Sequence, residues 1–170
     1  MIETGNIVVG GGGHAGAQVC IGLAEAGLGA RLHLVCEEPE LPYQRPPLSK
    51  AYLKNPEEGL QTHRGAAWFE EHGLTVHLAD AVTAIDRAAR TVALRSGAVL
   101  AYAQLVLTTG TRARQLPGLP NDLDNVAVVR TAHDAQRMRA LLAGAGRVTV
   151  LGGGSSAWRW PPPRAHSARP

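Results

Sequence analysis

Three glycines with the spacing G-x-G-x-x-G, namely Gly11, Gly13 and Gly16, lie near the start of the chain. In a turn that binds a dinucleotide, the first glycine permits a tight bend and the second lets the backbone approach a pyrophosphate. The third lets the following helix pack closely on a strand. The N-terminus of that helix presents free N–H groups and a partial positive charge to the phosphates. These residue types therefore predict a site for the diphosphate of a dinucleotide.

The residues around the glycines supply the strands and the helix that such a site needs. An apolar stretch at 6–9 precedes them, apolar residues at helical spacing follow over 17–26, and a second strand is expected at 31–36. Glu37 comes directly after this second strand, twenty-one residues after Gly16, where a carboxylate would accept hydrogen bonds from ribose hydroxyls. The order strand, helix, strand predicts a parallel sheet. A strand–turn–helix unit with a solvated glutamate is the alternative.

Further along the chain, the sequence predicts short elements separated by loops. Four prolines within 37–48 predict an ordered loop there, because proline fits neither a helix interior nor a central strand. Helices are expected at 49–53 with Ser49 as the cap, at 66–72, and at 131–143 with Thr131 as the cap. Strands are expected at 75–78, 82–85, 91–94, 99–102, 105–108, 126–129 and 147–151. Of these, 91–94 and 99–102 are expected to form a hairpin.

The segment 37–53, EEPELPYQRPPLSKAYL, contains the run P-Y-x-R-P-P-L-S-K and resembles the ferredoxin and rubredoxin reductases of bacterial oxygenase systems. These putidaredoxin reductase-like flavoproteins belong to the pyridine nucleotide-disulfide oxidoreductase superfamily. The similarity continues in three further segments: 82–86, VTAID; 102–110, YAQLVLTTG; and 130–135, RTAHDA. Gln104 replaces an acid of the family's pattern, Thr108 replaces an alanine, and Val129 replaces a leucine.

The resemblance implies FAD as the cofactor, NAD(P)H as the electron donor, and a ferredoxin or rubredoxin-type iron–sulfur protein as the acceptor. By the match, the residues that would bind FAD are Gly11, Gly13, Ala15, Gly16, Glu37, Arg45, Lys50, Val82, Gly110 and Arg130. Lys50 would lie near the isoalloxazine ring as a catalytic cation that stabilises negative charge on reduced flavin. Arg45 would neutralise phosphate or support the ring. Two alternatives stay open: Lys50 and Arg45 as ordinary surface cations, and a domain that binds NAD alone.

Cys20 and Cys36 are the only cysteines, and they form neither a C-x-x-C motif nor a zinc pattern. Both are expected to be small buried residues. Disulfide reductases of the same superfamily use a close pair of redox-active cysteines, which this sequence lacks. The resemblance therefore implies hydride transfer from NAD(P)H to flavin, followed by single-electron transfer to the iron–sulfur protein, with no metal site in this chain.

The composition is that of an ordinary globular protein, because 45% of the residues are hydrophobic and 18% are charged. The net charge of +3 resides in the last twelve residues, which carry Arg159, Arg164 and Arg169 and no acid. The balanced charge of the remainder argues against nucleic-acid binding. The sequence contains no run of eighteen apolar residues, so no membrane span is expected. The N-terminus lacks the basic start of a signal peptide. A cytoplasmic location is therefore expected.

Three segments are expected from the match: the first part of an FAD-binding domain at 1–145, the start of an NAD(P)H-binding domain at 146–154, and an aberrant tail rich in proline, arginine and tryptophan at 155–170. The tail begins where a helix should follow Gly152, Gly153 and Gly154, and out-of-frame translation would account for it. A natural proline-rich tail that binds a partner is the alternative.

The expected fold is α/β: a Rossmann-like FAD-binding domain with a parallel sheet and a small antiparallel β layer, truncated at the start of the NAD(P)H-binding domain. The expected function is that of the amino-terminal fragment of an FAD-dependent NAD(P)H oxidoreductase. The isolated chain is predicted to be inactive, because the nicotinamide must be held against the flavin. A non-catalytic FAD-binding module, or an inactive remnant, is the alternative.

Overall fold

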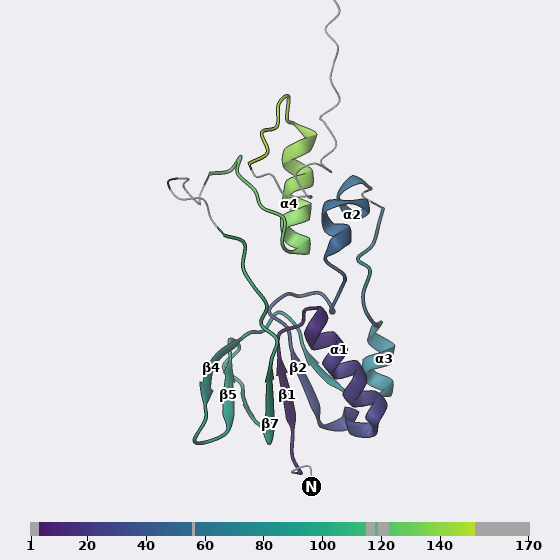
Figure 1. Cartoon of the computed structure of the whole chain (residues 1–170), viewed down its shortest axis with the longest axis vertical. Coiled ribbons are helices and arrows are strands. Elements are labelled where there is room, and N and C mark those ends of the chain that lie inside the picture. Colours follow the sequence, from purple (N-terminus) through teal and green to yellow (C-terminus); the bar gives the residue numbers. More distant parts are fainter. Residues whose placement is uncertain (1–3, 56, 115–117, 119–122, 152–170) are drawn as a thin grey trace, which may run out of the picture. The chain divides into compact units, whose positions relative to one another are not determined.

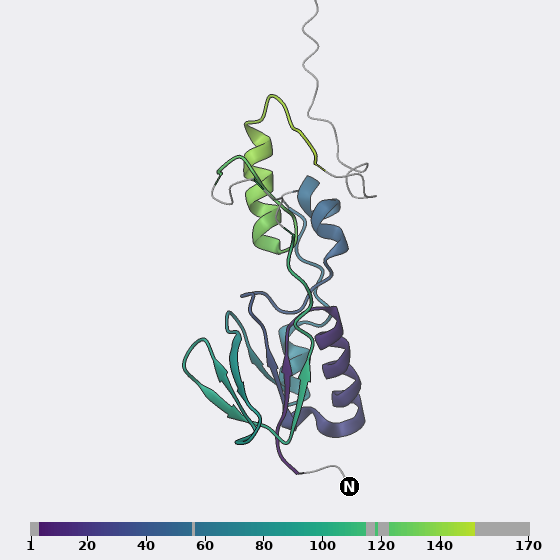
Figure 2. The ribbon, with the colours of Figure 1, turned by 60° about the vertical axis from the view of Figure 1, so that its left-hand side comes forward.

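The computed structural model describes residues 4–55, 57–114, 118 and 123–151. The chain divides into two compact units. The first unit consists of residues 1–44 and 61–111, and the second of residues 45–60 and 112–170. Figures 1 and 2 show the helices and strands of both units.

The first unit is built on a four-stranded parallel sheet with the strand order β3-β2-β1-β7 (Figure 1). Its strands are β1 (Ile7–Gly10), β2 (Leu32–Val35), β3 (Thr75–His77) and β7 (Gln104–Leu107). β1 pairs with both β2 and β7, and all four of its residues are buried. A parallel sheet is normally covered on both faces, which explains the continuous apolar run of β1. The predicted parallel sheet is confirmed.

Helices cover one face of this sheet. α1 (His14–Leu23) follows β1, and α3 (Ala66–Glu71) precedes β3. Between α1 and β2 the chain passes through the π-helical turn η1 (Ala24–Leu28) and the 3₁₀ turn η2 (Gly29–Arg31), and Gly27 adopts φ +80°. The core between helices and sheet consists of apolar side chains: Ile7, Val9, Cys20, Ala24, Leu32, Leu34, Cys36, Phe69 and Leu74. Burial of each Leu, Ile or Phe side chain contributes about 1.5–3 kcal/mol.

A three-stranded antiparallel sheet covers the opposite face. Its strands, in the order β4-β5-β6, are β4 (Val82–Asp86), β5 (Thr91–Leu94) and β6 (Val99–Ala101). Successive side chains of a strand point to opposite faces of its sheet. The side chains that point away from the helices therefore form a second buried cluster: Val8, Val35, Val92 and Leu94. The predicted hairpin is confirmed, and β4 extends it by one strand.

The described part of the second unit contains the helical elements η3 (Pro46–Ser49), α2 (Ala51–Lys54) and α4 (Ala132–Ala143). α4 begins with a capping box, in which the Thr131 hydroxyl accepts from the Asp134 N–H and the Asp134 carboxylate accepts from the Thr131 N–H. The predicted Thr131 cap is confirmed. The predicted Ser49 cap is wrong, because Ser49 lies in η3 and Lys50 occupies the N-cap position of α2. Within the described residues, no helix has the length and apolar character that a membrane span requires.

Side chains of α4 bind the short helix α2. Arg139 Nε donates to the Leu53 carbonyl at 3.3 Å, and the same guanidinium donates to the Tyr52 carbonyl. Its central carbon lies 5.1 Å from the centre of the Tyr52 ring, and Gln136 donates to the Tyr52 hydroxyl at 3.0 Å. The last carbonyls of a helix lack hydrogen-bond donors within the helix, and here the Arg139 guanidinium donates to two of them. α4 therefore stabilises the segment that begins at Lys50.

Two predicted strands are wrong. Residues 126–129 and 147–151 form neither helix nor strand. A strand is stable only where its N–H and C=O groups meet those of a neighbouring strand, and no strand in the described part of the chain pairs with either segment. Val128, Val150 and Leu151 are accordingly exposed. The predicted glycine turn at 152–154 and the aberrant tail at 155–170 lie outside the described residues.

Candidate dinucleotide-binding site

The carboxyl ends of the parallel strands β1, β2 and β7 meet at one edge of the sheet. Gly10, the last residue of β1, is aligned with Val35 of β2 and with Leu107 of β7. The segments that follow these strands therefore begin side by side, and one of them is the glycine turn at 11–16. In open α/β sheets, ligands bind outside the carboxyl ends of the strands. We therefore take this edge as the candidate site.

Gly11 and Gly16 are required by close packing of the backbone. Gly11 adopts φ +120°, which other residues rarely adopt, and a Cβ there would lie 2.3 Å from the Thr108 carbonyl oxygen. A Cβ on Gly16 would lie 2.0 Å from the Gly11 carbonyl oxygen and 2.8 Å from the Thr108 hydroxyl. That hydroxyl donates to the Gly11 carbonyl at 2.9 Å. The turn, the helix and the loop after β7 are thus packed with no room for a methyl group.

Gly13 is different, because no atom lies within 4 Å of a Cβ built on it. It occupies the N-cap of α1 with φ −80°, a value that any residue can adopt. The first N–H groups of an α-helix have no acceptor within the helix, and Ala15 in this first turn is exposed. The first turn of α1 contains no acidic residue, so the partial positive charge of this helix end is not offset from within the helix. Open space in front of Gly13 and N–H groups that have no acceptor within the helix fit a bound diphosphate.

Glu37, Val82 and Gly110 lie at the same edge. A Cβ on Gly12 would lie 2.4 Å from the Cys36 sulfur, which places Glu37 next to the glycine turn. A methyl group of Val82 lies 3.5 Å from a Cβ built on the last residue of β1. Gly110, with φ +67°, lies in the loop that follows β7. The structure thus brings the predicted residues of the first unit to one edge: Gly11, Gly13, Ala15, Gly16, Glu37, Val82 and Gly110.

Glu37 forms an ion pair with Arg95, which the sequence analysis missed. Arg95 Nη2 lies 3.0 Å from Glu37 Oε1, and about half of each side chain is exposed. Arg95 lies in the turn between β5 and β6, where its N–H donates to the Ala81 carbonyl at 2.8 Å. The two paired residues are 58 positions apart in the chain. No local spacing rule could have indicated the pair.

The buried carboxylate of Asp80 holds the same turn. It accepts hydrogen bonds from the Ser96 hydroxyl at 2.7 Å, the Ser96 N–H at 3.0 Å and the Ala81 N–H at 3.0 Å. The Asp80 N–H donates to the Cys36 carbonyl at 2.9 Å, one residue before Glu37. The hydrogen bond from the Ser96 hydroxyl lowers the pKa of Asp80, although burial opposes this effect. Asp80 is thus a charged residue that links the β5–β6 turn to the end of β2.

His14, within the glycine turn, contacts His63, which the sequence analysis also missed. His14 Nδ1 lies 3.3 Å from His63 Nε2, with the ring centres 4.7 Å apart. The loop that carries His63 is held by a hydrogen bond from its N–H to the Pro42 carbonyl at 2.8 Å. Burial, followed by the nearby His14, lowers the pKa of His63. A second histidine therefore lies beside the turn, 49 positions further along the chain.

The three remaining predicted residues belong to the second unit. The Arg45 guanidinium donates to the Arg130 carbonyl at 2.7 Å, so these two residues are in contact. The Arg130 N–H donates to the Asp134 carboxylate at 3.0 Å, which connects it to the cap of α4. Lys50 is exposed at the N-cap of α2. The contacts of these residues with FAD stay predictions.

Cys20 and Cys36 are buried, as the sequence predicts, and both are free cysteines. Burial raises the pKa of each thiol to about 12. Because the thiolate is the reactive form, neither cysteine is activated at neutral pH. Among the described residues, no group of three or more histidine, cysteine or acidic side chains could hold a metal ion.

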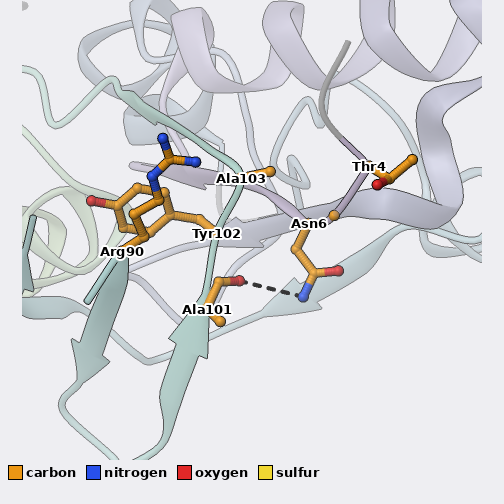
Figure 3. A pocket seen from close by; sticks show the side chains of 7 residues that line it. Thr4, Asn6, Arg90, Ala101, Tyr102 and Ala103 are labelled. Carbon is orange, nitrogen blue, oxygen red and sulfur yellow. Dashed lines mark hydrogen bonds between the residues drawn. The ribbon is translucent and has the colours of Figure 1, made fainter. Parts of the chain in front are cut away.

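An open hollow of about 540 Å³ lies at another place in the first unit (Figure 3). It is lined by residues just before β1, such as Asn6, by Arg90 just before β5, by the end of β6, and by residues just before β7, such as Tyr102. These residues mark the amino end of the parallel sheet, opposite the glycine turn. The Asn6 side chain donates to the Ala101 carbonyl at 3.4 Å across this hollow. None of the predicted site residues lines it.

A family model described as pyridine nucleotide-disulphide oxidoreductase matches residues 5–158. The chain belongs to this family. A ferredoxin–NAD(P)(+) reductase of Sphingomonas sp. is 38% identical over 151 residues, which cover 88% of this chain and 36% of the relative. The crystal structure of a ferredoxin reductase from Rhodopseudomonas palustris has a TM-score of 0.75 and 38% identity, over 81% of this chain and 34% of its own. The crystal structure of the covalent putidaredoxin reductase–putidaredoxin complex has a TM-score of 0.74 and 35% identity, over 82% of this chain and 34% of that chain.

This pyridine nucleotide-disulphide oxidoreductase chain spans about a third of the length of the relatives that it matches. The match confirms the resemblance that the segment 37–53 indicates. It also confirms the α/β fold with a parallel and an antiparallel sheet. Ferredoxin reductases of the family use FAD, in agreement with the cofactor that the resemblance implies.

Proposed function

We propose that this chain binds FAD as the FAD-binding part of a ferredoxin or rubredoxin reductase. The observation that carries the proposal is the sheet edge where Gly11 and Gly16 are closely packed and Gly13 opens onto the N-terminus of α1. FAD would lay its diphosphate on the N–H groups of α1 and its ribose hydroxyls on the Glu37 carboxylate. Its adenine would meet the backbone of Val82. The proline-rich segment and the ferredoxin reductase relatives support FAD rather than NAD alone.

The second unit would bind the other parts of the cofactor. Arg45 would neutralise phosphate or support the ring, and Arg130 would line the dinucleotide. Lys50 would hold its ammonium group where negative charge develops on the flavin. When bound, FAD would accept hydride from NAD(P)H and release single electrons to a ferredoxin or rubredoxin-type iron–sulfur protein.

Reconstitution with FAD tests the proposal, with two variants that each add one methyl group. Gly13→Ala places it in the open space before α1, and Gly22→Ala places it further along α1, where no atom lies within 4 Å either. We expect the wild type and Gly22→Ala to bind FAD equally. Gly13→Ala should bind it at least about tenfold more weakly, because charge-assisted hydrogen bonds to phosphate contribute about 1.5–3 kcal/mol.

Thermal unfolding of the same samples is the control. Neither added methyl group meets protein atoms. Gly22→Ala should therefore melt at or above the wild-type temperature, whereas Gly13→Ala should lose about 1 kcal/mol of stability, because alanine is a poorer N-cap than glycine. Equal FAD binding by Gly13→Ala and Gly22→Ala would contradict the assignment of the diphosphate to this turn. A folded wild-type chain that binds no FAD would contradict the proposed function itself.

The chain spans about a third of the length of its relatives. The alternative that we propose is a non-catalytic FAD-binding module. In that case the 170 residues bind the cofactor without transferring electrons from NAD(P)H. Reconstitution does not separate the two functions, whereas an electron-transfer assay does.

A further inference from the structure

We propose that Arg95 is a positioning residue for the adenosine end of the bound dinucleotide. It holds the Glu37 carboxylate in the orientation in which that carboxylate accepts the ribose hydroxyls. This inference rests on the proposed function and adds a residue to it. It is carried by the contacts that join the β5–β6 turn to the end of β2.

The first step is the geometry of the ion pair. Glu37 is an exposed side chain in the loop after β2, and such a side chain has several rotamers of similar energy. The 3.0 Å contact between Arg95 Nη2 and Glu37 Oε1 selects one of them. A carboxylate offers about four acceptor positions, and the Arg95 contact engages the Oε1 atom. The pair therefore orients the Glu37 carboxylate.

The second step is the anchoring of Arg95. Its N–H is bonded to the Ala81 carbonyl at 2.8 Å, and the next residue, Ser96, donates twice to the Asp80 carboxylate. Asp80 is only 8% exposed, and its own N–H is bonded to the Cys36 carbonyl, directly before Glu37. These contacts form a closed path from the Glu37 backbone to the Glu37 side chain. The guanidinium is thus brought to the carboxylate from a fixed backbone, which lowers the entropy cost of the pair.

The third step is the location of the pair relative to the ligand. The carboxylate that Arg95 contacts is the one assigned to the ribose, and Ala81, which anchors Arg95, precedes the adenine-contacting residue Val82. Arg95 therefore lies on the adenosine side of the site. A loss of Arg95 should weaken every ligand that contains adenosine diphosphate.

The test measures dissociation constants for FAD and for ADP, which has the adenosine and the diphosphate but no flavin. We expect Arg95→Ala to raise both constants about 2- to 5-fold at low ionic strength, the range of an exposed ion pair. Arg95→Lys should restore part of the loss, and high salt should reduce the difference between wild type and Arg95→Ala. Arg87→Ala removes the same charge from the β4–β5 turn, at the other end of the antiparallel sheet, and should change neither constant.

A double-mutant cycle separates positioning from other roles. Glu37→Gln should weaken both ligands by about tenfold or more, and Arg95→Ala should add nothing in the Glu37→Gln background. If Arg95→Ala weakens binding equally in both backgrounds, Arg95 contacts the ligand directly and the inference is wrong. Tighter binding by Arg95→Ala would also overturn it, because the arginine would then compete with the ribose for Glu37.

Different measurements test the two proposals. A wild-type chain that binds neither FAD nor ADP would contradict the proposed function and, with it, the role of Arg95. If the wild-type chain binds both ligands and the Arg95→Ala variant binds them with the same affinity, only the proposed role of Arg95 is contradicted. Urea unfolding of each variant shows whether a change in affinity reflects a change in stability.

Discussion

The glycines of the turn at 11–16 differ in what surrounds them. Gly11 and Gly16 face backbone atoms of the protein at distances that exclude a side chain, whereas Gly13 faces open space. Gly12 faces the Cys36 sulfur in the same way, although the G-x-G-x-x-G pattern leaves its position undefined. Substitutions at the different glycines should therefore separate folding from binding.

Gly16→Ala is predicted to destabilise the fold. The added Cβ would lie 2.0 Å from the Gly11 carbonyl oxygen, so that the helix α1 or the turn must move. Overpacking of this kind costs about 1–3 kcal/mol. Gly22→Ala in the same helix is the matched control, and it should stabilise the fold by about 0.5–1 kcal/mol, because alanine favours the helix. Urea unfolding measures both, and equal stabilities of the two variants would refute the close contact.

At the scale of elements, strands β2 and β3 bring two histidines together. His33 Nδ1 lies 3.2 Å from His77 Nε2, and the two rings are stacked with centres 5.5 Å apart. His33 is aligned with Val8, so it lies on the face of the parallel sheet that the antiparallel sheet covers. Burial, followed by the proximity of His77, lowers the pKa of His33.

The fold should therefore lose stability as the pH falls below about 6.5, the ordinary histidine value. In the folded chain His33 binds its proton only at lower pH than in the unfolded chain, so protonation favours unfolding in this window. The lowered pKa of His63 acts in the same direction. His33→Gln should reduce the loss of stability between pH 7 and pH 5 in urea titrations. An unchanged pH dependence would show that His33 does not have the lowered pKa that its burial indicates.

The elements also show what a local pattern can predict. The glycine turn, the strand before it and Glu37 lie within one strand–helix–strand unit, and the sequence predicted all of them. The hairpin of β5 and β6 was predicted for the same reason. The segments 126–129 and 147–151 have apolar residues typical of strands, but a strand also needs a partner, which a local apolar run does not specify. Ser49 was misassigned because helix caps depend on dihedral angles at the exact boundary.

At the scale of the whole molecule, the residues missed by the sequence analysis are those whose partners are distant in the chain. Arg95 meets Glu37 across 58 positions, and His63 meets His14 across 49. Asp80 is connected to Ser96 across 16 positions and to the end of β2 through its backbone. Each contact depends on how the antiparallel sheet and the loops are placed around the parallel sheet. The motif predicted the site, whereas the tertiary fold supplies the residues that support it.

The non-catalytic alternative predicts that a preparation of these 170 residues loaded with FAD shows no family-like reduction of ferricyanide or ferredoxin by NADH or NADPH. The chain spans about a third of the length of its relatives, and hydride transfer requires the nicotinamide to be held against the flavin. Dithionite, which needs no binding site, should still bleach the flavin and serves as the positive control. Turnover at rates typical of ferredoxin reductases would refute the non-catalytic alternative and support the proposed reductase function.

The burial of Cys20 and Cys36 in the core between the helices and the parallel sheet has a practical consequence. Each thiol is shielded by the core and has a pKa of about 12, so an alkylating reagent can modify it only when this region opens. Both cysteines of the chain are of this kind. The rate of their modification therefore reports the opening of this core, and a ligand that binds the proposed site at the adjoining sheet edge should slow it without any introduced label.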